Sequence, residues 1–325
     1  MNSVLQTAAP AFSIDEAQSI ANRRYGIEAA ARQLTSERDQ NFHLRTRDGA
    51  EFVLKIANAS ESEAVIAFQN AVMRHLEVYD PTLPAPHVLP TRDGAFHFVE
   101  RGHLTRMLTF RAGRLMHQGE RTSLLRRSLG RAHARLSKAL SSFAAEAPPG
   151  DLFWDVQHAQ QLRPLLKHIA STERASVLRA TLDRFEAKAL PWLERAPRQV
   201  IHNDLNPHNV VIDDEGAVSG VIDFGDMVSA PLICDVAVAA AYHVRHDETP
   251  MADALEYVDA FSAERALTAE EISLLPIIVA MRLAMTVLIT NWRANLYPDN
   301  RAYILRNEPN AWRGLVAMTE AEPLT

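Results

Sequence analysis

The sequence predicts an α+β fold of two lobes, with a small antiparallel β lobe followed by a larger, mainly helical lobe. Its 325 residues exceed what one compact core usually holds. Short apolar runs bounded by turn residues dominate the first third of the chain, whereas apolar residues at helical spacing dominate the rest. We therefore expect one lobe over residues 1–112 and a second over residues 113–325.

The first lobe should contain two helices and five strands. Ser13 followed by Glu16 is a capping-box arrangement that predicts the start of a helix. Apolar residues at helical spacing predict a second helix over 60–78, and Asp48-Gly49 is a hairpin turn signal. We expect these strands to form one antiparallel sheet, over residues 30–34, 41–45, 51–56, 96–100 and 104–110.

Helical spacing of apolar residues runs through most of the second lobe. The stretch 274–289 is too short to span a bilayer, which takes about 20 residues, and it contains Arg282, so we expect a buried helix. Strand-like pieces occur only at 200–201, 210–212 and 218–222. The expected helices cover residues 117–143, 156–169, 175–194, 234–243, 252–262, 269–294 and 302–321.

Composition excludes several classes of function. Lys and Arg number 34 against 40 Asp and Glu, a net charge of -6, so the chain lacks the basic excess of a nucleic-acid-binding protein. The single cysteine, Cys234, cannot form an internal disulfide. The first thirteen residues lack the charge and the apolar core of a secretory signal. We expect a cytoplasmic protein with no nucleic-acid or membrane partner.

The motif His202-x-Asp204-x-x-x-x-Asn209 is the first that carries chemistry. In phosphoryl transfer, an aspartate at this position orients or deprotonates the attacking hydroxyl, and the asparagine five residues later holds Mg2+. His202 is expected to brace the loop, because the chemistry already has its base in Asp204. The spacing thus predicts a catalytic loop.

Two further residues fit the same chemistry. Asp223 follows an apolar run and precedes Phe224-Gly225, as in the Asp-Phe-Gly metal site of protein kinases. Lys55 lies among apolar residues in an expected strand, where its ammonium group is costly to bury without an anionic partner. Phosphate oxygens would be that partner.

The order of Lys55, the Asp204 motif and Asp223 resembles the aminoglycoside phosphotransferase and choline kinase superfamily over nearly the whole chain. Segments 34–42, 154–155, 222–227 and 291–293 are more narrowly similar to hydroxylysine kinases and to the kinase-like domain fused to some class III aminotransferases. The resemblance implies a protein-kinase-like two-lobe fold with a nucleotide-binding N-terminal lobe and a catalytic, acceptor-binding C-terminal lobe. It implies a phosphotransferase that moves the γ-phosphoryl group of ATP or GTP to an alcohol.

The resemblance also implies roles for individual residues. Asp204 would be the catalytic base, Asn209 and Asp223 the Mg2+ ligands, and Lys55 the contact to the α- and β-phosphates. The loop 36–42 would cover the nucleotide, and the backbone of 109–111 would receive the purine. The nucleotide contacts would therefore include Ser36, Gln40, Asn41, Thr109 and Arg111.

The expected acceptor is small and cationic, either an amino alcohol or a hydroxy amino acid such as hydroxylysine. Asp204 and Asp226 would favour an ammonium group near the transferring phosphate. Trp154 would line the acceptor site, and Arg293 could clamp a carboxylate bidentately. Each of these three assignments has a plain alternative, a solvated loop acid for Asp226 and packing for the other two.

Some points stay open from the sequence. The family commonly has a Glu partner for its lysine where Gln69 stands here; Gln69 can hydrogen-bond Lys55 but cannot neutralise it. The role of His208 is open. The alternative functions are an aminoglycoside O-phosphotransferase and a non-catalytic nucleotide-binding module related to aminotransferase fusions. A protein kinase is disfavoured because no Ala-Pro-Glu motif follows Asp223.

Overall fold

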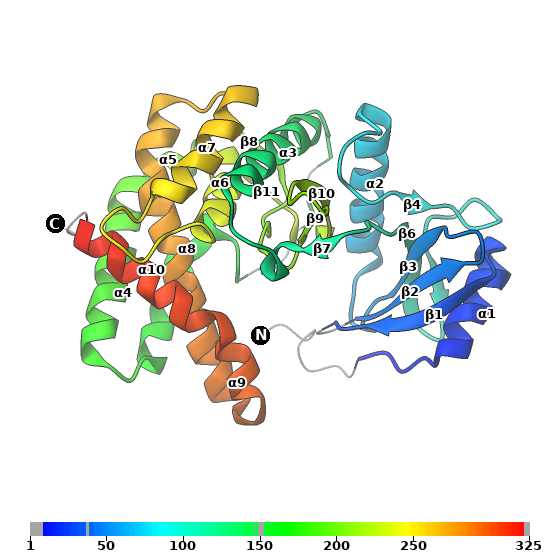
Figure 1. Ribbon diagram of the computed structural model, residues 1–325. Helices are drawn as coiled ribbons and strands as arrows, with labels where there is room; N and C mark the ends of the chain where they lie inside the picture. The colour runs from blue at the N-terminus through cyan, green and yellow to red at the C-terminus, as the bar shows by residue number, and fades with distance from the viewer. Residues whose placement is uncertain (1–8, 37–38, 146, 149–152, 322–325) are drawn as a thin grey trace. The chain divides into compact units, whose positions relative to one another are not determined.

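The computed structural model describes residues 9–36, 39–145, 147–148 and 153–321. The chain divides into two compact units. Unit 1 comprises Met1–Gly113, Ala147–Asp151 and Ser219–Gly225, and unit 2 comprises Arg114–Glu146, Leu152–Val218 and Asp226–Thr325. Unit 1 carries the large antiparallel sheet and unit 2 is mainly helical, which confirms the α+β fold class (Figure 1).

The sheet of unit 1 has six strands in the order β1-β2-β3-β6-β4, with β5 also paired to β6, and all pairings are antiparallel. All five expected strands are present. The sequence missed β4, because it has only two residues and lies within a proline-rich stretch. The strands are β1 (Ala29–Leu34), β2 (Gln40–Thr46), β3 (Glu51–Ile56), β4 (Val88–Leu89), β5 (Phe98–Glu100) and β6 (His103–Thr109).

The two faces of this sheet differ in character. On one face, Phe42, Leu54 and Met107 lie opposite one another on β2, β3 and β6, fully buried against α1 (Ile14–Tyr25). The capping box at Ser13 fixes the start of α1, as expected. Because side chains alternate along a strand, the residues next to these point to the other face. That second face carries the polar groups of the candidate site.

Unit 2 is built around α8 (Ala269–Leu296), which lies against α4, α6 and α10 (Figure 1). By length and composition α8 could cross a membrane, but 72% of its most apolar window is buried in the structure. Gly130 lets α3 approach α7, since a Cβ there would collide with the backbone carbonyl of Tyr257. The other helices are α3 (Ser123–Ser141), α4 (Thr172–Arg184), α5 (Leu190–Leu193), α6 (Leu232–Ala241), α7 (Ala252–Glu264), α9 (Arg301–Ile304) and α10 (Glu308–Ala321).

Short strands accompany the helices of unit 2. β11 (Val228–Pro231) pairs antiparallel with β8 (Arg198–Ile201), and β7 (Arg114–Leu115) pairs with β9 (Val210–Ile212). β10 (Val218–Val221) was expected, whereas β11 was not, because its sequence shows no period of two. The segment Val156–His168, expected as an α-helix, is a 3-10 helix with Pro164 inside it.

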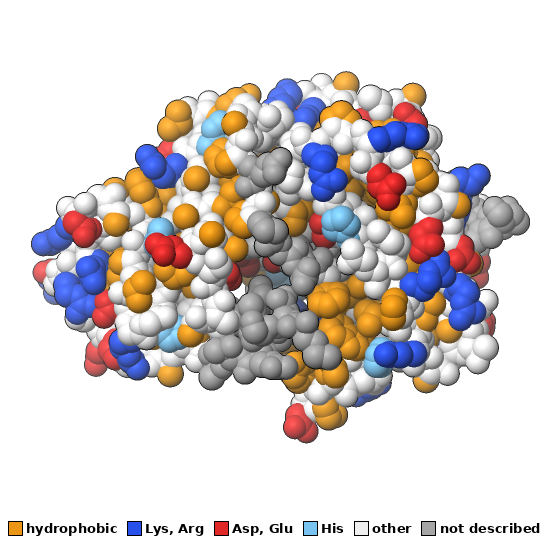
Figure 2. Space-filling model, turned by 180° about the vertical axis from the view of Figure 1, so that it is seen from behind, with side chains coloured by type: hydrophobic (Ala, Val, Ile, Leu, Met, Phe, Trp, Pro, Cys, Tyr) orange, Lys and Arg blue, Asp and Glu red, His pale blue; other side chains and the backbone are white. Residues whose placement is uncertain are grey.

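The surface seen from behind in Figure 2 carries Lys and Arg side chains interspersed with Asp and Glu. Charges of one sign do not gather into a stripe on the part of this face that the structure describes. This distribution agrees with the net charge of -6.

Candidate active site

The loop between β8 and β9 holds Asp204 and Asn209 together. The side-chain amide of Asn209 donates to the Asp204 carboxylate at 2.6 Å and to its backbone carbonyl at 2.9 Å. Asn206 donates to the same carboxylate oxygen at 2.8 Å. These hydrogen bonds fix the carboxylate in one orientation, and they turn the amide nitrogen of Asn209 toward Asp204. The two residues that the motif predicts as catalytic are therefore neighbours in unit 2.

Asp235, in the first turn of α6, holds the backbone of this loop in place. Its carboxylate accepts hydrogen bonds from the backbone N–H groups of His202 at 3.1 Å and Asn203 at 2.7 Å. His133 on α3 contacts the same carboxylate at 3.0 Å and bonds Tyr257 through its other ring nitrogen. Although full burial acts to raise it, the pKa of Asp235 is lowered by His133 and the backbone donors. The carboxylate therefore stays ionised and keeps the loop in place.

Backbone geometry at the loop is uncommon. Asn203 has φ 65°, a left-handed conformation that Asn tolerates better than most residues. The fully buried His202 accepts a hydrogen bond from the Asp204 N–H at 3.3 Å. This contact fits the bracing role that the sequence predicts for His202.

In unit 1, a polar row crosses the second face of the sheet. Asn41 on β2, Lys55 on β3 and Arg106 on β6 are direct partners in the strand register, so their side chains share one face. The Oδ1 atom of Asn41 is buried without a hydrogen-bond partner among the described residues. Lys55 Nζ lies 3.5 Å from an oxygen of Asp223. The row places two cations and an unused acceptor side by side.

Helix α2 (Glu63–Tyr79) holds Arg106 in this row. The guanidinium donates to Asn70 Oδ1 at 2.7 Å and to Gln69 Oε1. Burial lowers the pKa of Arg106 to about 10, and Asp223 is the acid that most opposes this shift. At neutral pH the side chain thus remains charged. The sequence leaves open whether Gln69 takes the place of the usual Glu partner of Lys55. Its amide oxygen accepts from Arg106, and its nitrogen donates to the Gly225 carbonyl at 3.5 Å.

Asp223 sits in a turn after β10, with φ 62° and about half of its side chain exposed. A Cβ at Gly225 would lie 3.1 Å from the Asp223 carboxylate oxygen, so the glycine leaves room for that carboxylate. Positive φ costs a non-glycine residue about 1 kcal/mol or more, and such strain concentrates at functional sites. The turn therefore holds an accessible carboxylate next to Lys55.

The predicted nucleotide contacts differ in the hydrogen bonds that they already make within the protein. Both polar atoms of the buried Gln40 side chain bond the backbone of Phe12, at 2.8 and 2.9 Å, so we leave Gln40 out of the nucleotide contacts. Ser36 is exposed, and the next two residues of its loop lie outside the described residues. The Thr109 N–H bonds the His87 carbonyl at 2.9 Å, whereas the Arg111 N–H has no partner in the described part of the chain. The Arg111 N–H therefore remains the predicted backbone contact to a purine.

A pocket of about 440 Å³ opens in unit 2 beside the catalytic loop. Pro207 and His208 of that loop form part of its wall, and Tyr242 and Arg282 form another part. The pKa of Tyr242 is raised by burial, lowered by Arg282 and raised by Asp204, so its hydroxyl stays protonated. The charges of Asp204 and Arg282 therefore both act on Tyr242. The volume suits a small molecule.

The His208 ring contacts the His117 ring in a tilted arrangement, with ring centroids 4.1 Å apart and an angle of 34° between the ring planes. Burial, His117 and Arg306 lower its pKa, so the ring is neutral at pH 7. A neutral imidazole in the wall of the pocket can donate or accept one hydrogen bond but carries no charge to the acceptor.

The residues predicted to bind the acceptor do not all lie at this pocket. Trp154 lies against the guanidinium of Arg282, 4.8 Å from ring centroid to Cζ, which places it next to the pocket. Arg293 is not among the residues that line the pocket. It follows Arg282 by eleven residues on α8, about 16 Å along the helix axis. Asp226 ends a 3-10 turn and is half-buried.

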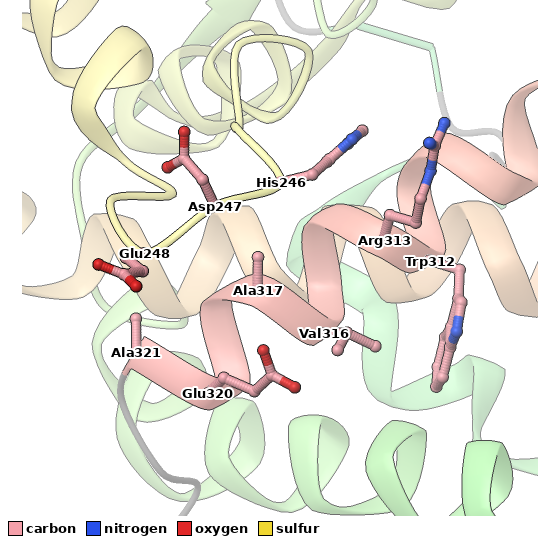
Figure 3. A pocket seen from close by; sticks show the side chains of 9 residues that line it. All are labelled: His246, Asp247, Glu248, Trp312, Arg313, Val316, Ala317, Glu320 and Ala321. Atoms are coloured by element: carbon pink, nitrogen blue, oxygen red, sulfur yellow. The ribbon is translucent and has the colours of Figure 1, made fainter.

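A second pocket, of about 520 Å³, lies between α10 and the loop 246–248 (Figure 3). Acids and bases line it together, and Asp247 is already paired with Arg245. No residue of the catalytic loop lines it. We therefore do not assign the acceptor to this pocket.

A metal site built wholly from protein side chains is not seen within the described ranges, where no three His, Cys, Asp or Glu residues cluster. Asp223 offers a carboxylate and Asn209 an amide oxygen, the hard donors that Mg2+ prefers, and Mg2+ commonly takes the remaining ligands from phosphates and water. The donor chemistry of these residues fits Mg2+.

Sequence reasoning missed three functional positions, Asp235, Arg106 and Arg282. Asp235 and Arg106 act through contacts with residues 32 to 36 positions away. The one available signal was the placement of Arg282 in a long apolar helix.

Comparisons with known proteins identify the family of this chain. The family model described as "Phosphotransferase enzyme family" matches residues 30–270. A hydroxylysine kinase of Mus musculus is 26% identical over 341 residues, which cover 95% of this chain and 90% of that protein. A homoserine kinase of Beijerinckia indica subsp. indica is 30% identical over 267 residues, covering 77% of this chain and 77% of that protein.

A solved structure of an amicoumacin kinase in complex with AMP-PNP, Ca2+ and Ami has a TM-score of 0.72 with this chain. The match covers 97% of this chain and 95% of the other at 14% identity, so it shows a shared fold.

Proposed function

The chain belongs to the phosphotransferase enzyme family and is a small-molecule kinase acting on a hydroxyl group, and we propose that it transfers the γ-phosphoryl group of ATP to a hydroxy amino acid or an amino alcohol. GTP is the alternative phosphoryl donor. The relatives that cover most of this chain are named for hydroxylysine and homoserine, which are both hydroxy amino acids.

The observation that carries the proposal is the geometry of the catalytic loop. Two side-chain amides, those of Asn206 and Asn209, donate three hydrogen bonds to Asp204, and Asp235 fixes the backbone that precedes it. A carboxylate held in this way can accept a hydrogen bond from an incoming hydroxyl and take its proton as the new P–O bond forms. Asp204 is the proposed general base.

Unit 1 supplies the proposed phosphate contacts. Lys55 and Arg106 present positive charge on one face of the sheet, and Lys55 would exchange part of its contact with Asp223 for phosphate oxygens. Arg111 would give its backbone N–H to the purine. Asn209 and Asp223 are the proposed holders of Mg2+, which neutralises charge on the β- and γ-phosphates when bound.

The acceptor amine has a proposed partner in Asp226. Two acids, Asp204 and Asp226, favour an ammonium group near the transferring phosphate, where an uncharged alcohol would gain nothing from them. Trp154 would cover the apolar part of the acceptor beside the pocket.

The test is a nucleotide-consumption assay with purified protein, Mg2+ and ATP over hydroxylysine, homoserine, matched amino alcohols and aminoglycosides. We expect turnover with a hydroxy amino acid or an amino alcohol and none in the Asp204→Asn variant. Turnover with aminoglycosides alone would contradict the proposal. Substituting GTP for ATP at equal concentration identifies the donor.

A further inference from the structure

The central helix of unit 2 buries an arginine in apolar surroundings. Arg282 is only 4% exposed, and its neighbours in sequence, Met281 and Leu283, are buried apolar residues of α8. Arginine is rarely buried to this degree unless an anion accompanies it, because desolvating a guanidinium costs several kcal/mol. Retaining such a residue in the core needs a partner.

Among the described residues, the hydrogen-bond partners of Arg282 are neutral. The Nη atoms of Arg282 donate to the hydroxyls of Thr286 and Tyr242, both at 3.3 Å, and the guanidinium lies over the Trp154 ring. Its Nε is buried and finds no hydrogen-bond partner in the part of the chain that the structure describes. Across the residues that the structure describes, no carboxylate forms an ion pair with Arg282. These contacts hold the group in one orientation and leave its charge uncompensated.

The side chain lines the pocket beside the catalytic loop, and the other charged groups there are of the same sign. Arg121 also lines this pocket, together with three histidines, while no Asp or Glu of the described chain does. The Arg121 guanidinium donates one hydrogen bond to the backbone carbonyl of Tyr242 at 2.9 Å. A ligand that fills this pocket therefore meets positive potential at the end where Arg282 lies.

We infer that Arg282 binds the carboxylate of the acceptor and so makes the enzyme specific for hydroxy amino acids over amino alcohols. The inference rests on the proposed function and adds a recognition group to the same site. The planar guanidinium matches a carboxylate with two parallel hydrogen bonds, which gives orientation as well as charge neutralisation.

Tyr242 connects this subsite to the reacting end. Its hydroxyl accepts a hydrogen bond from Arg282, and the charge of Asp204 raises its pKa, so both charged groups lie close to it. A molecule with a carboxylate at Arg282 and a hydroxyl at Asp204 would cross the pocket past Tyr242 and the neutral His208. Arg282 acts as a binding residue, and it takes no part in proton transfer.

The experiment compares matched substrates in the full-length protein. Homoserine and hydroxylysine are each paired with the compound left by removing the carboxylate, and kcat and KM are measured for the wild type, Arg282→Met and Arg282→Lys. We expect the wild type to prefer the carboxylate member of a pair. Arg282→Met should lower kcat/KM for that member about 30-fold or more, chiefly through KM, and leave the decarboxylated member nearly unchanged. Lys should restore part of the loss, because it keeps the charge without the planar fork.

Arg174→Met is the matched control. Arg174 also lies over a tryptophan, Trp312, but it is paired with Glu308, so its loss should affect stability and not the substrate preference. Equal kcat/KM for both members of a pair in the wild type would overturn the carboxylate subsite while leaving the kinase function standing. Loss of both members to the same degree in Arg282→Met would also overturn it, since a structural role predicts that result.

Binding measurements distinguish the outcomes that the kinetic assay leaves open. If no member of the panel is phosphorylated, the proposed acceptor class is wrong, and calorimetric titration of homoserine and hydroxylysine then tests the subsite directly. Binding that Arg282→Met abolishes would support the subsite, and absence of binding to the wild type would overturn it. Competition by inorganic phosphate at equal concentration would show a general anion site and contradict the specificity for a carboxylate.

Discussion

Arg106 lies directly opposite Lys55 in the antiparallel pairing of β3 with β6, so two cationic side chains share one face of the sheet. Gln69 and Asn70 hold the guanidinium with neutral oxygens, which leaves its charge in place. A Glu at position 69 would instead have neutralised one of the two cations. This face of the sheet, next to Asp223, therefore carries two positive charges, and its electrostatic potential is more positive than Lys55 alone would produce.

Lys55→Met should weaken ATP binding about tenfold or more, because a single charge-assisted contact to phosphate contributes on the order of 1.4 kcal/mol. Arg106 remains in the variant, so binding should be reduced and not abolished. Equilibrium titration of ATP with Mg2+ measures the effect. Lys138→Met, an exposed lysine on α3 at 3.8 Å from Glu264, is the control and should bind ATP normally. An unchanged Kd in Lys55→Met would remove Lys55 from the phosphate contacts.

Asp204→Asn should lower kcat about 100-fold or more with little change in ATP affinity, because the lost group serves the acceptor hydroxyl. The amide is isosteric and its oxygen can still accept from Asn206 or Asn209, so the melting temperature should stay close to that of the wild type. Steady-state kinetics and nucleotide titration together decide it. Asp214→Asn alters an exposed acid of the same unit and should be silent. A variant that keeps more than about a tenth of wild-type kcat would show that Asp204 is not the base.

Asp223→Ala should remove the dependence of nucleotide binding on Mg2+, because the carboxylate is the strongest hard ligand proposed for the ion. Calorimetry with ATP is run with and without Mg2+. Gly225→Ala is a graded companion, since its Cβ would stand 3.1 Å from the Asp223 carboxylate and displace it slightly. We expect an intermediate loss there. The same Mg2+ dependence in Asp223→Ala as in the wild type would be incompatible with a metal ligand.

His243 should make the folded protein sensitive to acid. Burial lowers its pKa to about 3, with Arg121 and Arg126 adding to the shift, so the folded state keeps it neutral. The unfolded chain takes up a proton below about pH 6.5, so the free energy of unfolding falls as pH decreases through that value. Relative to His243→Leu, the wild type should lose about 2 kcal/mol between pH 8 and pH 5.

Urea unfolding of both proteins at the two pH values measures this difference. His243 Nε2 has no hydrogen-bond partner among the described residues, so the leucine variant loses no bond at that atom. Parallel changes with pH in the two proteins would show that another group is responsible. At pH 8 both forms are neutral, and their difference there measures packing alone.

The sequence predicts the fold class and the residues that act through short-range spacing. The interval from Asp204 to Asn209 is fixed by one loop, and the structure joins these two residues directly. Most strands and helices follow from apolar periodicity. It does not predict β4, β7 and β11, where two or four residues carry too little pattern, or the 3-10 geometry of Val156–His168.

Residues that act across long intervals could not be predicted in the same way. The partner of the catalytic loop, Asp235, lies inside an apolar helix where nothing marks it as an anchor. From the sequence, Gln69 is a possible hydrogen-bond partner of Lys55, but its amide oxygen accepts from Arg106 on the adjacent strand. The pairing of β3 with β6, which brings Arg106 next to Lys55, is not visible in the sequence. From the sequence, Arg293 is a candidate carboxylate clamp because its planar guanidinium can bind a carboxylate bidentately, with packing as the alternative; burial at the pocket favours Arg282.

Asp235 also relates the loss of activity on heating to the unfolding of unit 2. Its carboxylate joins the backbone before Asp204 to His133 on α3, and His133 in turn contacts Tyr257 on α7. Three helices from distant parts of the sequence thus share one buried hydrogen-bonded chain with the catalytic loop. The loop cannot melt by itself while these helices remain packed. Heat inactivation should therefore coincide with the cooperative unfolding of unit 2, without an earlier temperature range in which a folded protein has already lost its activity.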